Sequence, residues 1–164
     1  MNLVTIITPI YNGEKYLIRY FEQLNAIRYK NLQIIVVNDG SKDKTSEIVQ
    51  KYAEEDNRIE FIDKKLKGVS SARNDALKRA KGTFCFFFDC DDTFDAQIVD
   101  KCVAKVKSDT DTVCYNYASV RRNGSIAEHE FSYLKHQYNK KDILEQILPR
   151  SFGTSIADLK GYLS

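Results

Sequence analysis

Three carboxylates stand within four residues in the segment Asp89-Cys90-Asp91-Asp92, directly after a run of five apolar residues. Carboxylates this close repel one another when ionised, and a divalent cation removes that repulsion. Mg²⁺ and Mn²⁺ prefer oxygen ligands, and proteins often hold them through one or two carboxylates plus substrate phosphates. The alternative is that the acids only favour the amino end of the next helix through its dipole. The strand-like run before them favours a site for Mn²⁺ or Mg²⁺.

Two further polar positions could contact a ligand, one after an apolar run and one near the start of a predicted helix. Asp39 stands before Gly40, and an Asp-Gly pair is equally typical of a simple turn. Arg73 falls in the first turns of a predicted helix, where the helix amino end and a guanidinium fork together suit a phosphate group. The alternative for Arg73 is a surface ion pair with Asp75 or Glu60.

The first predicted strand ends in a turn at residues 9–13 that contains Tyr11. An aromatic ring there can stack on a nucleobase, although it can equally pack on a neighbouring loop. The turn carries no Gly-x-Gly-x-x-Gly pattern, and the chain has no phosphate-binding Gly-x-x-x-x-Gly-Lys motif, so two common nucleotide-binding folds are disfavoured. The histidines, His129 and His136, are expected at the surface.

The elements that must position these residues alternate along the chain. Apolar runs predict strands, and apolar positions at helical spacing predict helices between them. The expected strands cover residues 3–8, 33–38, 58–63 and 83–88. The expected helices cover residues 13–27, a segment from an N-cap at Asp43, residues 68–82, and residues 95–107. This alternation predicts an α/β domain with a mostly parallel central sheet flanked by helices, whose ligands bind beyond the carboxyl ends of the strands.

Two helices have predicted buried faces. The buried face of the first is Leu17, Tyr20, Phe21, Leu24 and Ile27. The buried face of the third is Val69, Ala72, Ala76, Leu77 and Ala80. Later in the chain we expect a strand at 111–119, a hairpin turn at Asn123-Gly124, a returning strand at 125–133 and a short helix at 140–148.

Composition bounds the class of protein. The 164 residues suit a domain of ordinary size, and an apolar fraction of 43% suffices for a core. A formal net charge of only +2 does not call for a nucleic acid partner. The cysteines lack zinc-ligand spacing, and no run is long enough to span a bilayer. We therefore expect a cytoplasmic protein with reduced thiols, and peripheral association with the inner face of a membrane is compatible with the sequence.

Four motifs occur in an order and spacing that resemble the family 2 glycosyltransferases, over residues 1 to about 120. The motifs are Thr8-Pro9-Ile10-Tyr11-Asn12, Val37-Asn38-Asp39-Gly40-Ser41, Gly68-Val69-Ser70-Ser71-Ala72-Arg73-Asn74 and Phe88-Asp89-Cys90-Asp91-Asp92. The resemblance implies a GT-A fold, to which the sequence pattern adds the C-terminal hairpin and short helix, and inverting transfer of a hexosyl or N-acetylhexosaminyl group. The implied donor is a nucleotide-diphospho-sugar, usually a UDP-sugar, and the implied acceptor is a saccharide or lipid-linked hydroxyl.

The resemblance also implies roles for individual residues. It implies that Thr8, Pro9 and Tyr11 cradle the base, and that Asp39 hydrogen-bonds it. Arg73 is implied to lie near the diphosphate. Asp89 is implied to face the ribose and metal, Asp91 to bind the metal, and Asp92 to contact the sugar or the surroundings of the metal.

One departure limits this resemblance. Family members use a carboxylate general base in a Glu-Asp pair downstream of the Asp-x-Asp motif, and no such pair follows Asp91. The catalytic base is therefore unassigned. We expect residues 1–120 to be the donor-binding domain and residues 121–164 to be the start of a truncated acceptor-side region. Alternatives are a nucleotide-binding fragment without catalysis and a related sugar-phosphate nucleotidyltransferase.

Overall fold

The computed structural model describes residues 2–106, 113, 115, 117–121 and 123–129 of the chain. The chain divides into two compact units, residues 1–111 and 112–164, and each is described by itself. The functional boundary at residue 120, between a donor and an acceptor region, stays a prediction.

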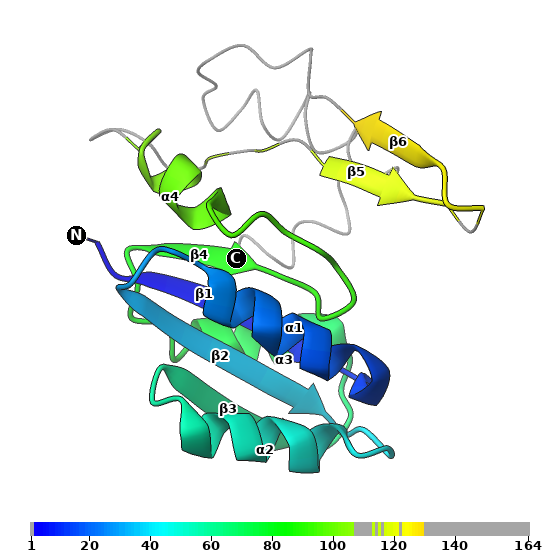
Figure 1. Cartoon of the computed structure of the whole chain (residues 1–164). Coiled ribbons are helices and arrows are strands. Elements are labelled where there is room, and N and C mark those ends of the chain that lie inside the picture. Colours follow the sequence, from blue (N-terminus) through cyan, green and yellow to red (C-terminus); the bar gives the residue numbers. More distant parts are fainter. Residues whose placement is uncertain (1, 107–112, 114, 116, 122, 130–164) are drawn as a thin grey trace, which may run out of the picture. The chain divides into compact units, whose positions relative to one another are not determined.

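The first unit is built on four parallel strands in the spatial order β3-β2-β1-β4 (Figure 1). The strands are β1 (Val4–Ile10), β2 (Leu32–Asp39), β3 (Ile59–Lys64) and β4 (Phe84–Phe87). Every residue of β1 and all but Gln33 of β2 are buried, as expected for central strands covered on both faces. The predicted parallel sheet is confirmed.

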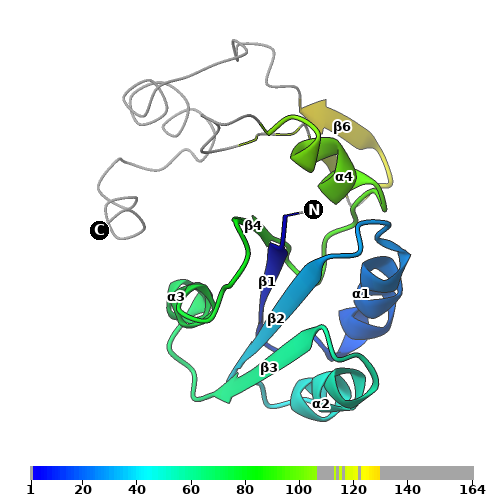
Figure 2. The same cartoon turned by 90° about the vertical axis from the view of Figure 1, so that its left-hand side faces the viewer.

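Helices cover both faces of this sheet. Figure 2 shows α1 (Glu14–Ala26) and α2 (Thr45–Glu55) on one face and α3 (Val69–Leu77) on the other. A fourth helix, α4 (Ile98–Val103), follows β4. The segment before α4 is tied to the end of α1, because the N–H of Arg28 donates to the carbonyl of Ala96 at 3.1 Å.

The first two helices follow their sequence patterns closely. The predicted buried face of α1 is confirmed, and each of its five residues is at most 1% exposed. The second helix begins at Thr45 with Lys44 as its N-cap residue, one position later than the predicted cap. The carboxylate of Asp43 still accepts the N–H of Thr45 at 3.0 Å, so it stabilises the first turn of α2.

The predicted buried face of α3 is wrong at two positions. Val69 and Leu77 are 50% and 42% exposed, whereas Ala72 and Ala76 are fully buried against the sheet. Leu77 lies about 100° around the helix from Ala76, which turns it off the contact face. Val69 is the first helical residue and precedes the turn that packs on the sheet. Small alanines let α3 approach the strands closely, so the contact face is narrower than the apolar pattern.

Two later elements, the fourth helix and the strand after it, begin later than predicted. The fourth helix was expected over 95–107 but spans Ile98–Val103, because residues 95–97 form a turn in which the Asp95 carboxylate accepts the N–H of Gln97. In the second unit, β5 (Tyr117–Val120) pairs antiparallel with β6 (Ile126–His129), which confirms the hairpin at Asn123-Gly124. Residues 113 and 115 are not in a strand, so β5 begins later than expected. The helix predicted at 140–148 lies outside the described residues.

The strand order reverses at β1. The chain adds β2 and then β3 on one side of β1, and it then crosses over through α3 to place β4 on the other side. In open α/β sheets, ligands bind in the crevice outside the carboxyl ends of the strands at such a reversal. The topology therefore directs attention to the segments that follow β1 and β4.

Candidate nucleotide-sugar site

The strand order places the expected ligand crevice where β4 leaves β1. The last bond between them runs from the N–H of Phe88 to the carbonyl of Ile7, at 3.1 Å. Pro9 lies two residues further along β1, so its backbone faces the same side, where β4 has already departed. A proline lacks an N–H and is tolerated in a central strand only where no ladder bond is lost. Pro9 therefore fits the mouth of the crevice.

The three predicted base contacts in the first motif differ in exposure. Thr8 is fully buried, and its hydroxyl forms a short hydrogen bond with the hydroxyl of Tyr20 on α1. Burial raises the pKa of Tyr20, so this hydroxyl stays protonated. Pro9 is also buried, whereas Tyr11 is 48% exposed. Of the three, Tyr11 presents the ring that is accessible for stacking, and Thr8 and Pro9 shape the strand end beneath it.

The acidic segment is a short loop closed at its base by aromatic rings. Phe88 precedes the loop and Phe94 follows it, and their rings stack at 4.2 Å between centroids and 10° between planes. Within the loop, the N–H of Asp92 donates to the carbonyl of Asp89 at 3.1 Å. The stack fixes both ends of residues 89–93. The stack and the turn bond together hold the loop that carries the three carboxylates.

The carboxylates of the loop are accessible and repel one another. The side chain of Asp89 is 47% exposed, and Asp91 and Asp92 are exposed as well. Burial of the inner part of Asp92, followed by the charges of Asp91 and Asp89, raises the pKa of Asp92, and Arg19 opposes the rise. This repulsion is the one predicted from the sequence, and these oxygen donors fit a hard divalent cation. Within the described ranges, no group of three or more His, Cys, Asp or Glu side chains is placed to hold a metal ion.

Arg73 joins the third motif to the acidic loop. Its Nη2 lies 2.9 Å from Oδ1 of Asp89. The two alternative partners from the sequence are bound elsewhere, because Lys64 and Lys78 pair with Asp75 and Arg79 pairs with Glu60. Nε of Arg73 is buried without a hydrogen-bond partner among the described residues. The guanidinium therefore keeps unused donor capacity beside the carboxylates.

Asp39 organises the loop that precedes α3. It is 3% exposed, and its two carboxylate oxygens accept the N–H groups of Lys67 at 3.0 Å and Gly68 at 2.7 Å. The Lys64 ammonium lies 4.0 Å away, and it binds Ser71 of α3 at 2.7 Å. Asp39 thus fixes the start of the helix that carries Arg73. Sequence reasoning missed this role, although a glycine at the predicted helix start pointed to a constrained backbone.

Asn12, Ser41 and Asn38 lie in the motifs, but sequence reasoning gave them no role. The N–H of Asn12 donates to the Ser41 hydroxyl, and the N–H of Lys42 donates to the Asn12 side-chain carbonyl, each at 2.8 Å. Ser41 in turn donates to Asn38, whose amide binds Asp63 of β3 at 2.9 Å. These bonds link the loops after β1 and β2 to each other and to the end of β3. They hold the segments that carry Tyr11 and Asp39 together at the carboxyl end of the sheet.

Cys90 is buried inside the acidic loop, against Gly13. A side chain on Gly13 would bring its Cβ within 3.2 Å of the Cys90 sulfur, so the loops after β1 and β4 pack closely. Burial, together with the charges of Asp91 and Asp89, raises the pKa of Cys90 to about 11.

We expect the raised pKa to protect Cys90 from alkylation. At pH 8 the folded thiol is roughly 100-fold less ionised than an ordinary cysteine, and only the thiolate is the nucleophile. Fragment-ion mass spectrometry after iodoacetamide treatment at pH 8 measures the modification of Cys90. The same chain in guanidinium chloride is the control and should be modified fast. Equally fast modification of the native protein would contradict a buried, protonated thiol.

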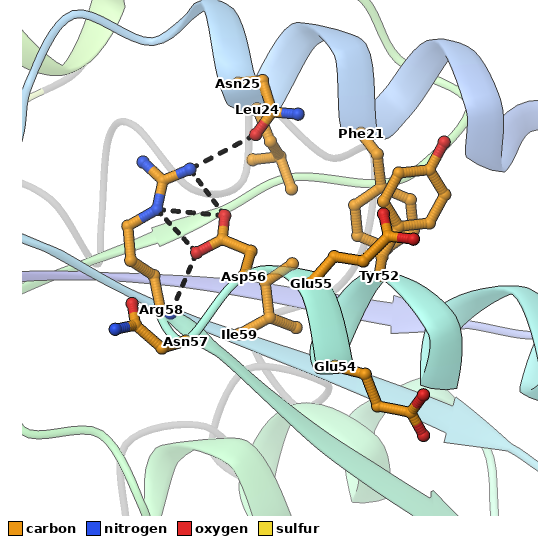
Figure 3. Close-up of a pocket in the computed structure, with 10 residues that line it drawn as sticks. All are labelled: Phe21, Leu24, Asn25, Tyr52, Glu54, Glu55, Asp56, Asn57, Arg58 and Ile59. Atoms are coloured by element: carbon orange, nitrogen blue, oxygen red, sulfur yellow. Dashed lines mark hydrogen bonds and ion pairs between the residues drawn. The ribbon is translucent and has the colours of Figure 1, made fainter.

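A cavity of about 550 Å³ lies at the other end of the sheet (Figure 3). It is lined by the ends of α1 and α2 and the start of β3, namely Phe21, Leu24, Asn25, Tyr52, Glu54, Glu55, Asp56, Asn57, Arg58 and Ile59. Arg58 is already bound there to the carboxylate of Asp56 at 2.6 Å and to Asn25 at 3.3 Å. None of the predicted site residues lines this cavity.

Comparison with known proteins identifies the class of fold first. The chain is similar to the solved mannosyltransferase PcManGT from Pyrobaculum calidifontis in complex with GDP-Man and Mn²⁺, with a TM-score of 0.59 and 24% identity over 62% of this chain and 31% of that one. It is also similar to S. aureus TarS in complex with UDP-GlcNAc, with a TM-score of 0.58 and 31% identity over 63% of this chain and 30% of that one. The first unit has the GT-A-like α/β fold of these glycosyltransferases.

The family follows from the sequence match. The pattern of Glycosyl transferase family 2 covers residues 5–160, and the chain belongs to that family. Glycosyltransferase GlyA of Streptococcus pneumoniae is 34% identical over 88% of this chain and 21% of its own length. The chain thus spans about a fifth of GlyA. In the described part of the chain, no helix has the length and apolar character needed to cross a membrane.

Proposed function

We propose that this chain binds a nucleotide-diphospho-sugar, most simply a UDP-sugar, as the donor domain of an inverting glycosyltransferase. The observation that carries the proposal is the ion pair between Arg73 and Asp89 at the reversal of strand order. It brings the guanidinium that would bind the diphosphate next to the acidic loop that would bind the metal ion. The similarity to TarS, solved with UDP-GlcNAc, supports this class of donor.

The proposed roles follow the accessible chemistry. Asp91 and Asp89 would hold Mn²⁺ or Mg²⁺, which when bound neutralises charge on the leaving diphosphate. Asp92 would contact the sugar. Arg73, whose side chain is partly exposed beside Asp89, would donate to the diphosphate oxygens through the outer part of its guanidinium. Tyr11 would then stack on the nucleobase.

Three buried residues would shape the nucleobase site. Thr8 and Pro9 are buried at the end of β1, next to the exposed Tyr11 in the chain, and would form the floor of that site. Asp39 already accepts two backbone N–H groups, and an ionised carboxylate has about four acceptor positions, so it retains capacity for an N–H of the base. We propose that Asp39 acts both by holding the loop before α3 and by accepting from the base.

The proposal is tested by thermal unfolding with UDP. We expect UDP plus MnCl₂ to raise the melting temperature by several degrees, because a ligand at about 100 times its Kd adds about 2.7 kcal/mol to the folded state. UDP with EDTA, and MnCl₂ alone, should have much smaller effects. GDP in place of UDP tests the choice of base. Equal stabilisation by UDP in EDTA would refute a metal-bound diphosphate.

Donor binding without catalysis is the second candidate for this chain. It is favoured by one observation, that no Glu-Asp pair follows Asp91 in the sequence. A donor-hydrolysis assay with UDP-sugars separates the two, since release of UDP requires a competent site. A sugar-phosphate nucleotidyltransferase is disfavoured because the turn after β1 lacks a glycine-rich, basic loop.

The acceptor and the cellular setting follow from the proposed activity. We propose a saccharide or lipid-linked hydroxyl as acceptor and a cytoplasmic location at the inner face of the membrane. An assay with fractionated membranes, which asks whether the chain sediments with them, tests the location independently of catalysis.

A further inference from the structure

The helix α1 reaches the acidic loop through two side chains that the proposed chemistry does not use. Nη2 of Arg19 donates to the backbone carbonyl of Asp91 at 2.6 Å. Nε2 of Gln23 donates to the backbone carbonyl of Asp92 at 3.4 Å, and its Oε1 accepts the N–H of Phe94 at 3.1 Å. The carboxamide of Gln23 therefore binds the main chain on both sides of residue 93.

These contacts leave the carboxylates available. Arg19 donates to a main-chain oxygen of the loop. Its positive charge also lowers the pKa of Asp92, against the larger effects that raise it. The two hydrogen bonds of Gln23 to the loop likewise go to main-chain atoms. A guanidinium bound to a carbonyl forms a strong, charge-assisted hydrogen bond without occupying a metal-ligating group. The arrangement therefore holds the backbone of the loop and leaves its carboxylates exposed.

Helix α1 holds the two side chains that bind the loop in fixed positions. Arg19 and Gln23 are four residues apart, so they lie on the same side of α1. Between them, Tyr20 is buried and packs edge-on against Phe94, with ring centroids 6.3 Å apart. The helix is itself anchored by the buried face that includes Leu17 and Leu24. The loop is thus held by α1 from one side and by the Phe88–Phe94 stack at its base.

We propose that Arg19 and Gln23 are positioning residues that hold the backbone of the acidic loop in the conformation that binds the metal ion and diphosphate. This inference rests on the proposed function of the loop. Groups that orient metal ligands without touching the metal commonly change metal affinity by about 10- to 100-fold when they are removed. Replacing either Arg19 or Gln23 should lower the affinity of the loop for the metal ion while the fold stays intact.

The experiment measures the Kd for Mn²⁺ at saturating UDP, from the electron paramagnetic resonance signal of free Mn²⁺. We expect Gln23→Met and Arg19→Met each to raise this Kd by about 10- to 100-fold. Arg19→Lys should recover most of the affinity, because an ammonium can still donate to the carbonyl. Glu22→Ala, an exposed change on the same helix, is the matched control and should leave the Kd unchanged.

Melting in EDTA without nucleotide separates positioning from folding. Arg19 is exposed, so Arg19→Met should melt close to the parent chain even if Gln23→Met is less stable. Unchanged Mn²⁺ affinity in Arg19→Met, or a loss that Arg19→Lys shares in full, would overturn the inference. If the parent chain itself fails to bind Mn²⁺ with UDP, the proposed function of the loop fails instead. The two failures are therefore distinguishable.

Discussion

Replacing Gly40 by alanine is expected to destabilise the first unit by about 2–5 kcal/mol. Gly40 has a φ of 72°, a conformation that costs an alanine roughly 1–2 kcal/mol. The added Cβ would also lie 2.5 Å from the backbone nitrogen of Leu66, which cannot move without shifting the loop before α3. Overpacking of this kind typically costs a further ~1–3 kcal/mol. Urea unfolding followed by circular dichroism measures the loss.

The effect should extend to the nucleotide site, because the displaced loop is the one that Asp39 binds through Lys67 and Gly68. Gly124→Ala is the matched control, with a φ of 80° and open space around the new Cβ. It carries the conformational cost alone and lies in the second unit. If Gly40→Ala proves no less stable than the parent chain, the close approach of Leu66 to Gly40 is incorrect.

Substituting Asp91 by asparagine should weaken Mn²⁺-dependent UDP binding by roughly 100-fold, which corresponds to about 2.7 kcal/mol. The amide removes one of two proposed anionic ligands and keeps the size of the side chain. The other ligand, Asp89, already shares its charge with Arg73, so it compensates poorly. Because Asp91 is exposed, the fold should be unaffected. Isothermal titration with UDP, with and without MnCl₂, measures the change.

Asp95→Asn is the matched control for this substitution. Asp95 is an exposed acid just beyond the loop, and its carboxylate pairs with Lys101. Its replacement should leave the metal-dependent affinity within about twofold, since exposed ion pairs contribute little. Equal losses in both variants would indicate a general effect of negative charge. No loss in Asp91→Asn would remove Asp91 from the proposed metal site.

The sequence predicted those parts of the fold that depend on local patterns. β1 and β2 are continuous apolar runs, and α1 carries one apolar stripe at helical spacing, so each pattern had one plausible structure. For α3 the pattern was ambiguous, because Val69 and Leu77 are apolar but the sheet contacts only the alanine face. How closely a helix approaches a sheet depends on tertiary packing, which a single sequence does not display.

The candidate site was predicted in outline and missed in detail. The clustered acids after a strand pointed to Asp89, and the start of a predicted helix pointed to Arg73. Their ion pair joins two motifs, and the spacing of motifs along the chain does not predict contact between them. Arg19 contacts a backbone carbonyl 72 positions away. Main-chain atoms are the same in every residue, so no residue type in the loop could reveal that partner. The same reason hid the backbone contacts of Asp39.

Pro9 limits the length over which β1 and β4 can pair. β1 has a free side beyond Ile7, and an ordinary residue there would offer an N–H to which a departing chain could keep pairing. A proline offers no N–H, so the segment after Phe88 would form fewer hydrogen bonds if it continued as a strand along β1. The missing donor thus favours an end to the β1–β4 pairing at this position. The chain beyond Phe88 is then available to form the loop that carries the three acids.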